Sequence, residues 1–255
     1  MVTRQVTDRT VTEDVPTENS CAYNVLVNEQ DEYEVVDALG EAVFPIPNVP
    51  CNSERASSTV RRVLQHMANF KYFERIENRT PNPDLIASLT IEVENPSGDL
   101  NEVRIVHGKD ATFILKNEGE EQLYVGIFDL RSSWEVKALT PESGFEILRG
   151  RTEKGDGILR KPLKMTVPDF LQKSGRLDCE DTIKLFVTSK PTYFRASLPD
   201  IRHIVDGEGY RDQGEDFSSL IENLNGGMRG QTAGTWITRS FLIRTIMEPS
   251  TVTGK

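Results

Sequence analysis

The stretch Glu121–Pro141, EQLYVGIFDLRSSWEVKALTP, predicts two β-strands joined by a short polar turn. Apolar residues at Tyr124 and Ile127 face Trp134 and Val136 across the pair, with Asp129–Arg131 where the chain turns. Such short apolar runs bounded by polar turns are typical of antiparallel strands. The stretch contains no evident catalytic group. We therefore interpret it as the centre of a domain that holds and presents other surfaces.

The same pattern recurs on both sides of this pair. Leu89–Val93 alternates apolar and polar residues, as a half-buried strand does. Further strands are predicted at 103–106, 112–116, 144–148, 158–167, 182–188 and 235–247. Strands at this spacing without helices between them favour a sandwich over a βαβ fold. The sequence thus predicts a mainly β protein, an antiparallel β-sandwich.

Three shorter elements are predicted in addition to these strands. Ala22–Ile46 reads as a hairpin, and Ser53–Phe70 reads as a helix whose apolar face recurs every three or four residues. Phe217–Leu224 predicts a short amphipathic C-terminal helix, followed by a glycine-rich loop. The apolar face of the predicted Ser53–Phe70 helix comprises Ala56, Val60, Val63, Leu64, Met67 and Ala68. The predicted organisation is a flexible lead-in (1–21), a hairpin-plus-helix subdomain (22–80), the β-sandwich (81–247) and a tail (248–255).

Charge and cysteine content restrict the class of protein. The formal net charge is −10, which argues against nucleic acid or an anionic membrane as the main partner. No apolar run has the ~20 residues that a membrane span needs, and the N-terminus lacks the apolar segment of a secretory signal. Cys21, Cys51 and Cys179 are odd in number and widely spaced, which predicts three reduced thiols and a cytoplasmic location.

Candidate groups for catalysis and metal binding are sparse. His107 and Cys179 superficially match a peptidase dyad, but the acids beside Cys179 should raise the pKa of its thiol. Asp178, Glu180 and Asp181 lack the spacing of a calcium loop and read as a solvated acidic turn before a strand. The glycine-rich Asn223–Gly234 fails the phosphate-binding patterns. We therefore predict no catalytic residue, no cofactor and no metal.

The sequence offers a small set of candidate residues for binding a partner. Trp134 and Trp236 either stack on a sugar or peptide or belong to the core. The arginines of the first helix lie mainly outside its apolar face, where they are either solvated or available to a partner. The predicted partner-binding set is Trp134, Arg131, Arg61 and Arg62.

Three segments resemble the C-terminal extension of fungal caspase-like proteins. They are Tyr33–Pro50 (YEVVDALGEAVFPIPNVP), Val60–Asn78 (VRRVLQHMANFKYFERIEN) and the strands from LTIEVEN at Leu89 to the hairpin that ends at Pro141. The resemblance covers roughly Tyr33–Pro199, with Trp236–Ile246 as a closing strand. It implies an accessory β-sandwich that follows a peptidase domain. The catalytic His and Cys of the family belong to that other domain, so His107 and Cys179 receive no role from it.

These observations lead to three hypotheses of different classes. The first is a non-catalytic regulatory or protein-interaction domain whose partner is a protein, with a caspase-like peptidase domain as the candidate. The second is a β-sandwich that binds carbohydrate or peptide independently of any peptidase. The third is a hydrolase of unrecognised type, because carboxylates from distant strands can converge in a cleft.

Overall fold

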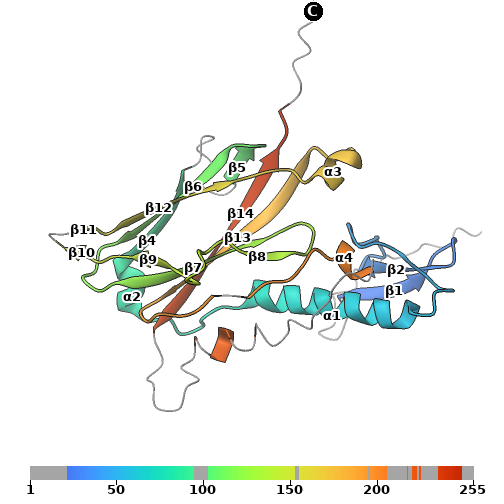
Figure 1. Ribbon diagram of the computed structural model, residues 1–255, viewed down its shortest axis with the longest axis horizontal. Coiled ribbons are helices and arrows are strands. Elements are labelled where there is room, and N and C mark those ends of the chain that lie inside the picture. Colours follow the sequence, from blue (N-terminus) through green and yellow to red (C-terminus); the bar gives the residue numbers. More distant parts are fainter. Residues whose placement is uncertain are drawn as a thin grey trace, which may run out of the picture. The chain divides into compact units, whose positions relative to one another are not determined.

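The computed structural model describes residues 22–94, 103–152, 155–194, 196–205, 217, 220–222, 224 and 235–248. Strands dominate this part of the chain, which confirms the predicted mainly β fold (Figure 1). The chain divides into two compact units, Met1–Ala56 and Ser57–Lys255. The predicted lead-in, and the predicted tail after Glu248, lie outside the described residues.

The described part of the first unit contains a three-stranded antiparallel sheet. The turn between its first two strands is held by Asn28, whose side-chain oxygen accepts hydrogen bonds from the backbone N–H groups of Gln30 and Glu32. Asn suits such a turn because its side chain can take the place of a backbone acceptor. The predicted hairpin is confirmed. In order across the sheet, the strands are β1 (Tyr23–Val27), β2 (Glu32–Asp37) and β3 (Val49–Pro50).

Two sheets form the sandwich of the second unit. The larger sheet has the order β5-β14-β13-β7-β8, with β9 also paired to β7, and the smaller has the order β12-β6-β4. One pairing differs from the antiparallel expectation: β14 and β5 run parallel, so the larger sheet is mixed. The strands are β4 (Leu89–Glu94), β5 (Val103–Val106), β6 (Asp110–Asn117), β7 (Leu123–Leu130), β8 (Val136–Ala138), β9 (Glu146–Leu148), β12 (Ile158–Lys164), β13 (Asp178–Thr188), β14 (Trp236–Ile246), and the short hairpin β10 (Arg151–Thr152) and β11 (Gly155–Asp156).

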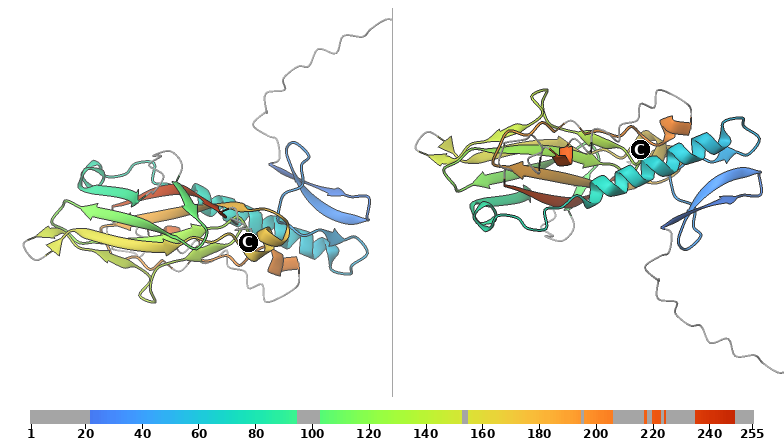
Figure 2. Two further views of the ribbon diagram at one scale, coloured as in Figure 1. Left: turned by 90° about the horizontal axis from the view of Figure 1, so that it is seen from above. Right: turned by 90° about the horizontal axis from the view of Figure 1, so that it is seen from below.

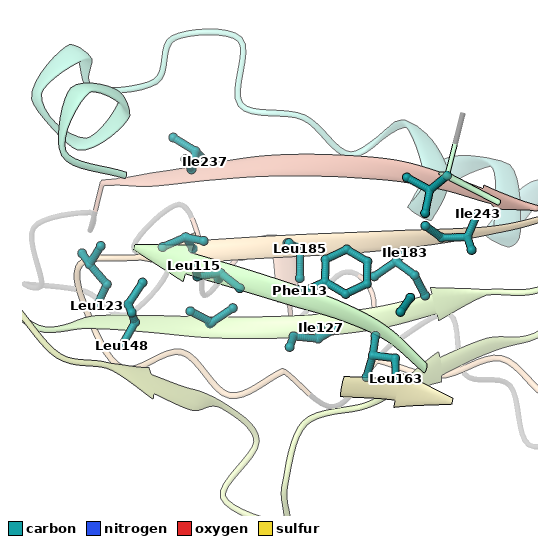
Figure 3. Close-up of a cluster of buried hydrophobic side chains, with 14 of the residues drawn as sticks. Phe113, Leu115, Leu123, Ile127, Leu148, Leu163, Ile183, Leu185, Ile237 and Ile243 are labelled. Carbon is teal, nitrogen blue, oxygen red and sulfur yellow. The ribbon is translucent and has the colours of Figure 1, made fainter. Parts of the chain in front are cut away.

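The inner faces of the two sheets share one hydrophobic core (Figure 3). Phe113 and Leu115 of β6 lie on the smaller sheet, and Ile127, Ile183 and Leu185 belong to β7 and β13 of the larger one. All five are fully buried. Alternate residues of each strand therefore fill the space between the sheets, as in other β-sandwiches.

Helix α1 (Ala56–Arg75) is longer than the predicted Ser53–Phe70 and lies beside the larger sheet (Figure 1 and Figure 2). It continues beyond Phe70 because Phe73 keeps to the buried face of the helix. The ring centroid of Phe73 lies 4.9 Å from that of Phe128 on β7 and 5.8 Å from that of Phe186 on β13. The helix was expected to group with the N-terminal hairpin. Its contacts instead make it the third layer of the sandwich unit, because large aromatic residues cover the outer face of the sheet.

The remaining helices are short. α2 begins after Asn82, whose side-chain oxygen accepts a hydrogen bond from Asp84 N at 2.8 Å. In the predicted C-terminal helix, the described residues Phe217, Leu220 and Leu224 are helical and each is 2% exposed. Within the described residues, no helix has the length and apolar character to cross a membrane. Three of these short helices are α2 (Pro83–Ser88), α3 (Asp169–Lys173) and α4 (Arg202–Val205).

Candidate functional site

A pocket of about 420 Å³ lies where α1 ends and β14 begins. Its lining comes from the last turn of α1, from the residues that follow this helix, from Ile221 and from Trp236. Ile76 and Trp236 are 6% and 8% exposed, whereas Tyr72 is 50% exposed. The pocket therefore combines buried apolar side chains with an accessible aromatic ring.

The chain after α1 is held in place by Asn78. Its side-chain nitrogen donates to the carbonyl oxygen of Trp236 at 2.7 Å, and its side-chain oxygen accepts from Thr80 N at 3.0 Å. The buried side chain of Ile76 gives a second fixed point. These two anchors set the position of Glu77 and Arg79 at the pocket.

Positive charge gathers at this pocket in a chain whose net charge is −10. Arg75 and Arg79 both line it and both are exposed. Among the described residues, no carboxylate forms an ion pair with either guanidinium group. Among the described residues of the lining, Glu77 alone is acidic, and the electrostatic interaction between Glu77 and the Lys184 ammonium offsets its charge. The pocket is thus suited to an anionic group.

Lys184 lies beneath the end of α1 and is 3% exposed. Its ammonium donates to the carbonyl oxygen of Glu74 at 2.7 Å, in the last turn of the helix. Burial lowers the pKa of Lys184 to about 8, and the charges of Glu77 and Glu74 oppose that shift. A cation at this position complements the negative end of the helix and fixes it to β13.

The exposed side of α1 forms a continuous stripe, which we call the α1 stripe: Arg61, Gln65, Ala68, Tyr72 and Arg75. The spacing of three or four residues puts these side chains on one side of the helix. The stripe contains two arginines and no acidic residue. Ala68 was predicted to lie on the apolar face, but it is exposed.

Of the two arginines predicted to bind a partner on α1, only Arg61 is exposed. Arg62 is half-buried, and its guanidinium donates to Thr59 Oγ1 at 3.3 Å. Arg61 thus lies on the α1 stripe, whereas Arg62 is occupied at least in part by a contact within the helix.

The structure places Trp134 in the interior rather than on an exposed surface. Trp134 has φ +60° and is 8% exposed. Its ring centroid lies 5.2 Å from that of Phe70, and the Lys71 ammonium lies 5.5 Å from the Trp134 ring. Its carbonyl oxygen is 2.7 Å from Nε2 of the buried His66. Because a carbonyl can only accept, this nitrogen carries the hydrogen, and burial lowers the pKa of His66.

Arg131 lies in the same turn as Trp134. Its guanidinium contacts Asp129 Oδ2 and Glu135 Oε2, each at 2.8 Å. These two ion pairs hold the turn between β7 and β8. The predicted pair Trp134 and Arg131 is therefore brought together, and both side chains are engaged within the domain.

A buried acidic cluster lies on the inner face of the larger sheet, at the end near this turn. Asp129 and Asp181 are 7% and 5% exposed. Asp181 Oδ1 accepts from Ser132 N at 3.0 Å, whereas Asp129 Oδ1 is buried without a hydrogen-bond partner. Burial, and then the charge of Asp129, raise the pKa of Asp181 to about 7. Burial likewise raises the pKa of Asp129, against the opposing effect of Arg131.

The acidic turn predicted before β13 is therefore corrected. Asp178 begins the strand itself, and its carboxylate accepts from Arg244 Nε at 2.9 Å on the neighbouring β14. Asp181 points inward because it alternates in phase with the core residues Ile183 and Leu185. Within the described residues, no group of three or more His, Cys, Asp or Glu side chains has the arrangement of a metal site.

The buried acid leads to a prediction about stability. A carboxyl group whose pKa is raised in the folded state stabilises the folded protein at low pH. This contribution to the free energy of unfolding is lost as pH rises from about 4 to about 7. We expect Asp181→Asn to match the wild type near pH 4 and to be about 1–4 kcal/mol more stable at pH 8. Urea unfolding across this range measures the difference. Glu180→Gln, on the exposed side of β13, is the control, and an equal gain in both variants would contradict the assignment.

The possible peptidase dyad gains no support from the geometry. Burial, and then the charge of Asp181, raise the pKa of Cys179 to about 12, as the neighbouring acids suggested. His107 Nδ1 accepts a hydrogen bond from Val167 N at 3.0 Å. A thiol with this pKa remains protonated at neutral pH, and the thiolate is the reactive form.

Two cysteines are described. Cys51 and Cys179 are free, in line with the prediction for these two residues. Cys21 lies outside the described residues, as does the whole glycine-rich segment 225–234.

Sequence reasoning missed the pocket at the end of α1. Its residues come from positions near 75, 221 and 236, and no local pattern joins them. One signal was available: the aromatic and basic residues Tyr72, Arg75 and Arg79 follow one another closely at the end of a helix. No protein-family model and no curated protein matches this chain.

Proposed function

We propose that this chain is a non-catalytic regulatory or protein-interaction domain that binds a caspase-like peptidase domain. The observation that carries the proposal is the α1 stripe. Its opposite side packs on the sandwich through Phe70 and Phe73, so the stripe is presented on a fixed support. Arginine and tyrosine are enriched in protein interfaces, whereas a lysine- and glutamate-rich solvated face is typical of helices without a partner.

The state of the thiol supports the non-catalytic part of this proposal. A cysteine nucleophile needs a lowered pKa or an adjacent base, whereas the Cys179 thiol has a pKa raised to about 12 and is 6% exposed. We expect no hydrolysis of reporter peptides that contain Arg, Lys or Asp. Turnover that disappears with Cys179→Ala would contradict this part of the proposal.

The choice of partner rests on the resemblance to the region that follows the peptidase domain in fungal caspase-like proteins. A cytoplasmic location is part of the same proposal. It is supported by the free thiols of Cys51 and Cys179, since disulfides are typical of oxidising compartments.

A binding experiment tests the α1 stripe. Ala68→Glu places a bulky charged side chain at the centre of the stripe, on an exposed helical position where it should fold normally. We expect this variant to weaken binding to an immobilised caspase-like peptidase domain at least tenfold, because it introduces charge and bulk into the interface. Lys164→Gln, exposed on β12, makes the same change in net charge and should alter binding less than twofold.

Biolayer interferometry gives both affinities. An absence of binding by the wild-type chain, or equal binding by Ala68→Glu and the wild type, would rule out the stripe as the interface. Circular dichroism confirms that each variant keeps the fold of the wild type.

A further inference from the structure

We propose that the pocket at the end of α1 binds a side-chain carboxylate of an acidic peptide segment in the partner, together with an adjacent apolar side chain. This inference rests on the proposed function, because it names the chemistry that the partner presents next to the α1 stripe. Arg75 and Tyr72 belong both to the stripe and to the pocket lining, so the two surfaces are continuous.

The carboxylate is inferred from two guanidinium groups that have no ion-pair partner among the described residues. Arg75 is in the last turn of α1 and Arg79 lies four residues farther on, and both line the same pocket. Guanidinium groups bind carboxylates through two parallel hydrogen bonds, which gives directional recognition as well as charge. Glu77 would repel an anion, but its interaction with Lys184 offsets that effect.

The apolar neighbour is inferred from the rest of the lining. Tyr72 presents half of its surface to solvent, and Ile76 and Trp236 close the inner side of the pocket. The Trp236 ring is itself held by Phe186, with ring centroids 6.4 Å apart in a stacked arrangement. A volume of about 420 Å³ is within the range of ligand-binding pockets, roughly 300–1,000 Å³, and has room for more than one side chain.

The pocket is built on fixed elements, which favours binding because little ordering is needed. Asn78 joins the residues after α1 to the carbonyl oxygen of Trp236, and Lys184 joins the last turn of α1 to β13. Both hydrogen bonds are 2.7 Å long. A pre-organised site loses less conformational entropy when it binds a peptide.

Fluorescence anisotropy with two labelled peptides tests the inference. The probe has the sequence Phe-Glu-Glu-Leu with blocked ends, and its control has Gln in place of each Glu. We expect the full chain to bind the acidic probe at least tenfold more tightly than the Gln control. The double variant Arg75→Gln/Arg79→Gln should lose at least tenfold in affinity for the acidic probe.

The matched control variant is Lys109→Gln/Lys164→Gln, which makes the same change in net charge at two exposed positions that belong neither to the α1 stripe nor to the pocket. We expect it to change the affinity for the acidic probe less than twofold. Equal losses in the two double variants would overturn the proposal, because they would indicate general attraction of an acidic peptide to positive charge on the protein. Equal binding of the two peptides would overturn it as well. A third test uses N-acetylglutamate amide, which has the carboxylate without the apolar neighbour. If this compound binds as tightly as the probe, the pocket is a site for a small carboxylate and the proposal is overturned.

This experiment separates the failure of the pocket from the failure of the proposed function. If the acidic probe does not bind but the peptidase domain binds and is sensitive to Ala68→Glu, the pocket assignment fails and the stripe assignment holds. If the acidic probe binds as expected but no peptidase domain binds, the partner assignment fails and the chemistry of the pocket holds.

Discussion

A chain that ends at Gly234 is expected to lose cooperative folding. The deletion removes β14, which pairs with β13 along all eleven of its residues and with β5 on its other side. It also removes the buried side chains of Trp236, Ile237 and Ile243. Truncating one such residue to Ala typically costs about 2–5 kcal/mol, whereas a whole domain is stable by only about 5–15 kcal/mol.

Circular dichroism and size-exclusion chromatography measure this loss, and the expected result is insoluble or molten protein. A chain that ends at Met247 is the control, because it retains the whole strand and the hydrogen bond from Met247 N to Leu177 O. It should unfold at the same temperature as the full chain. A soluble fragment 1–234 that unfolds cooperatively would show that β14 is dispensable.

Gly126→Ala is expected to destabilise the protein by roughly 2–4 kcal/mol, because overpacking typically costs about 1–3 kcal/mol and occasionally more. A Cβ atom on Gly126 would lie 2.4 Å from the ring of Phe194, far inside the normal contact distance. The strand cannot retreat, because residues of β7 on either side of Gly126 are paired with β13 and fully buried. Phe194 itself is fully buried and cannot swing into solvent without leaving a cavity.

A double-mutant cycle measures the effect and isolates its cause. Phe194→Leu should cost stability in the wild type but should recover part of the loss in the Gly126→Ala background, since a smaller side chain leaves room for the added methyl group. Urea unfolding of the four proteins gives the coupling energy. Additive losses in the two variants would contradict the steric account.

The local pattern of the sequence predicted most of the strands, because alternation records which side of a strand is buried. Leu89–Val93 and Thr182–Thr188 are strands for this reason. The same pattern contains no information on which strand lies next to which. The parallel neighbour β5 of strand β14 is separated from it by more than a hundred residues, and pairing over such a distance is decided by packing.

Two buried charged residues lie at positions that the alternation of their strand assigns to a buried face. Asp181 alternates in phase with Ile183, and Lys184 alternates in phase with Phe186, so both belong to buried faces by position alone. A charged residue within an apolar alternation is buried only when the tertiary structure provides compensation. Here the compensation comes from Ser132 N for the acid and from the carbonyl oxygen of Glu74 for the base.

The candidate site depended still more on tertiary structure. Arg61 was predicted because a basic residue outside the apolar face of a helix is exposed, and the structure places it on the α1 stripe. Trp134 was also predicted to bind a partner. A tryptophan in a β-rich segment packs inward, however, when a helix covers the sheet, and the Trp134 ring packs against Phe70 of α1. The pocket residues Arg79 and Trp236 are more than 150 positions apart, so only the folded chain brings them together.

Hydrogen–deuterium exchange of the full chain, with and without a caspase-like peptidase domain, tests the central claim most directly. Backbone amides that become protected by a partner identify the surface it covers. We expect protection of the amides on the exposed side of α1 and at residues 76–79, with little change in the smaller sheet β12-β6-β4. Protection confined to that smaller sheet, or no protection anywhere in the chain, would contradict the assignment of α1 and its terminal pocket as the partner-binding surface.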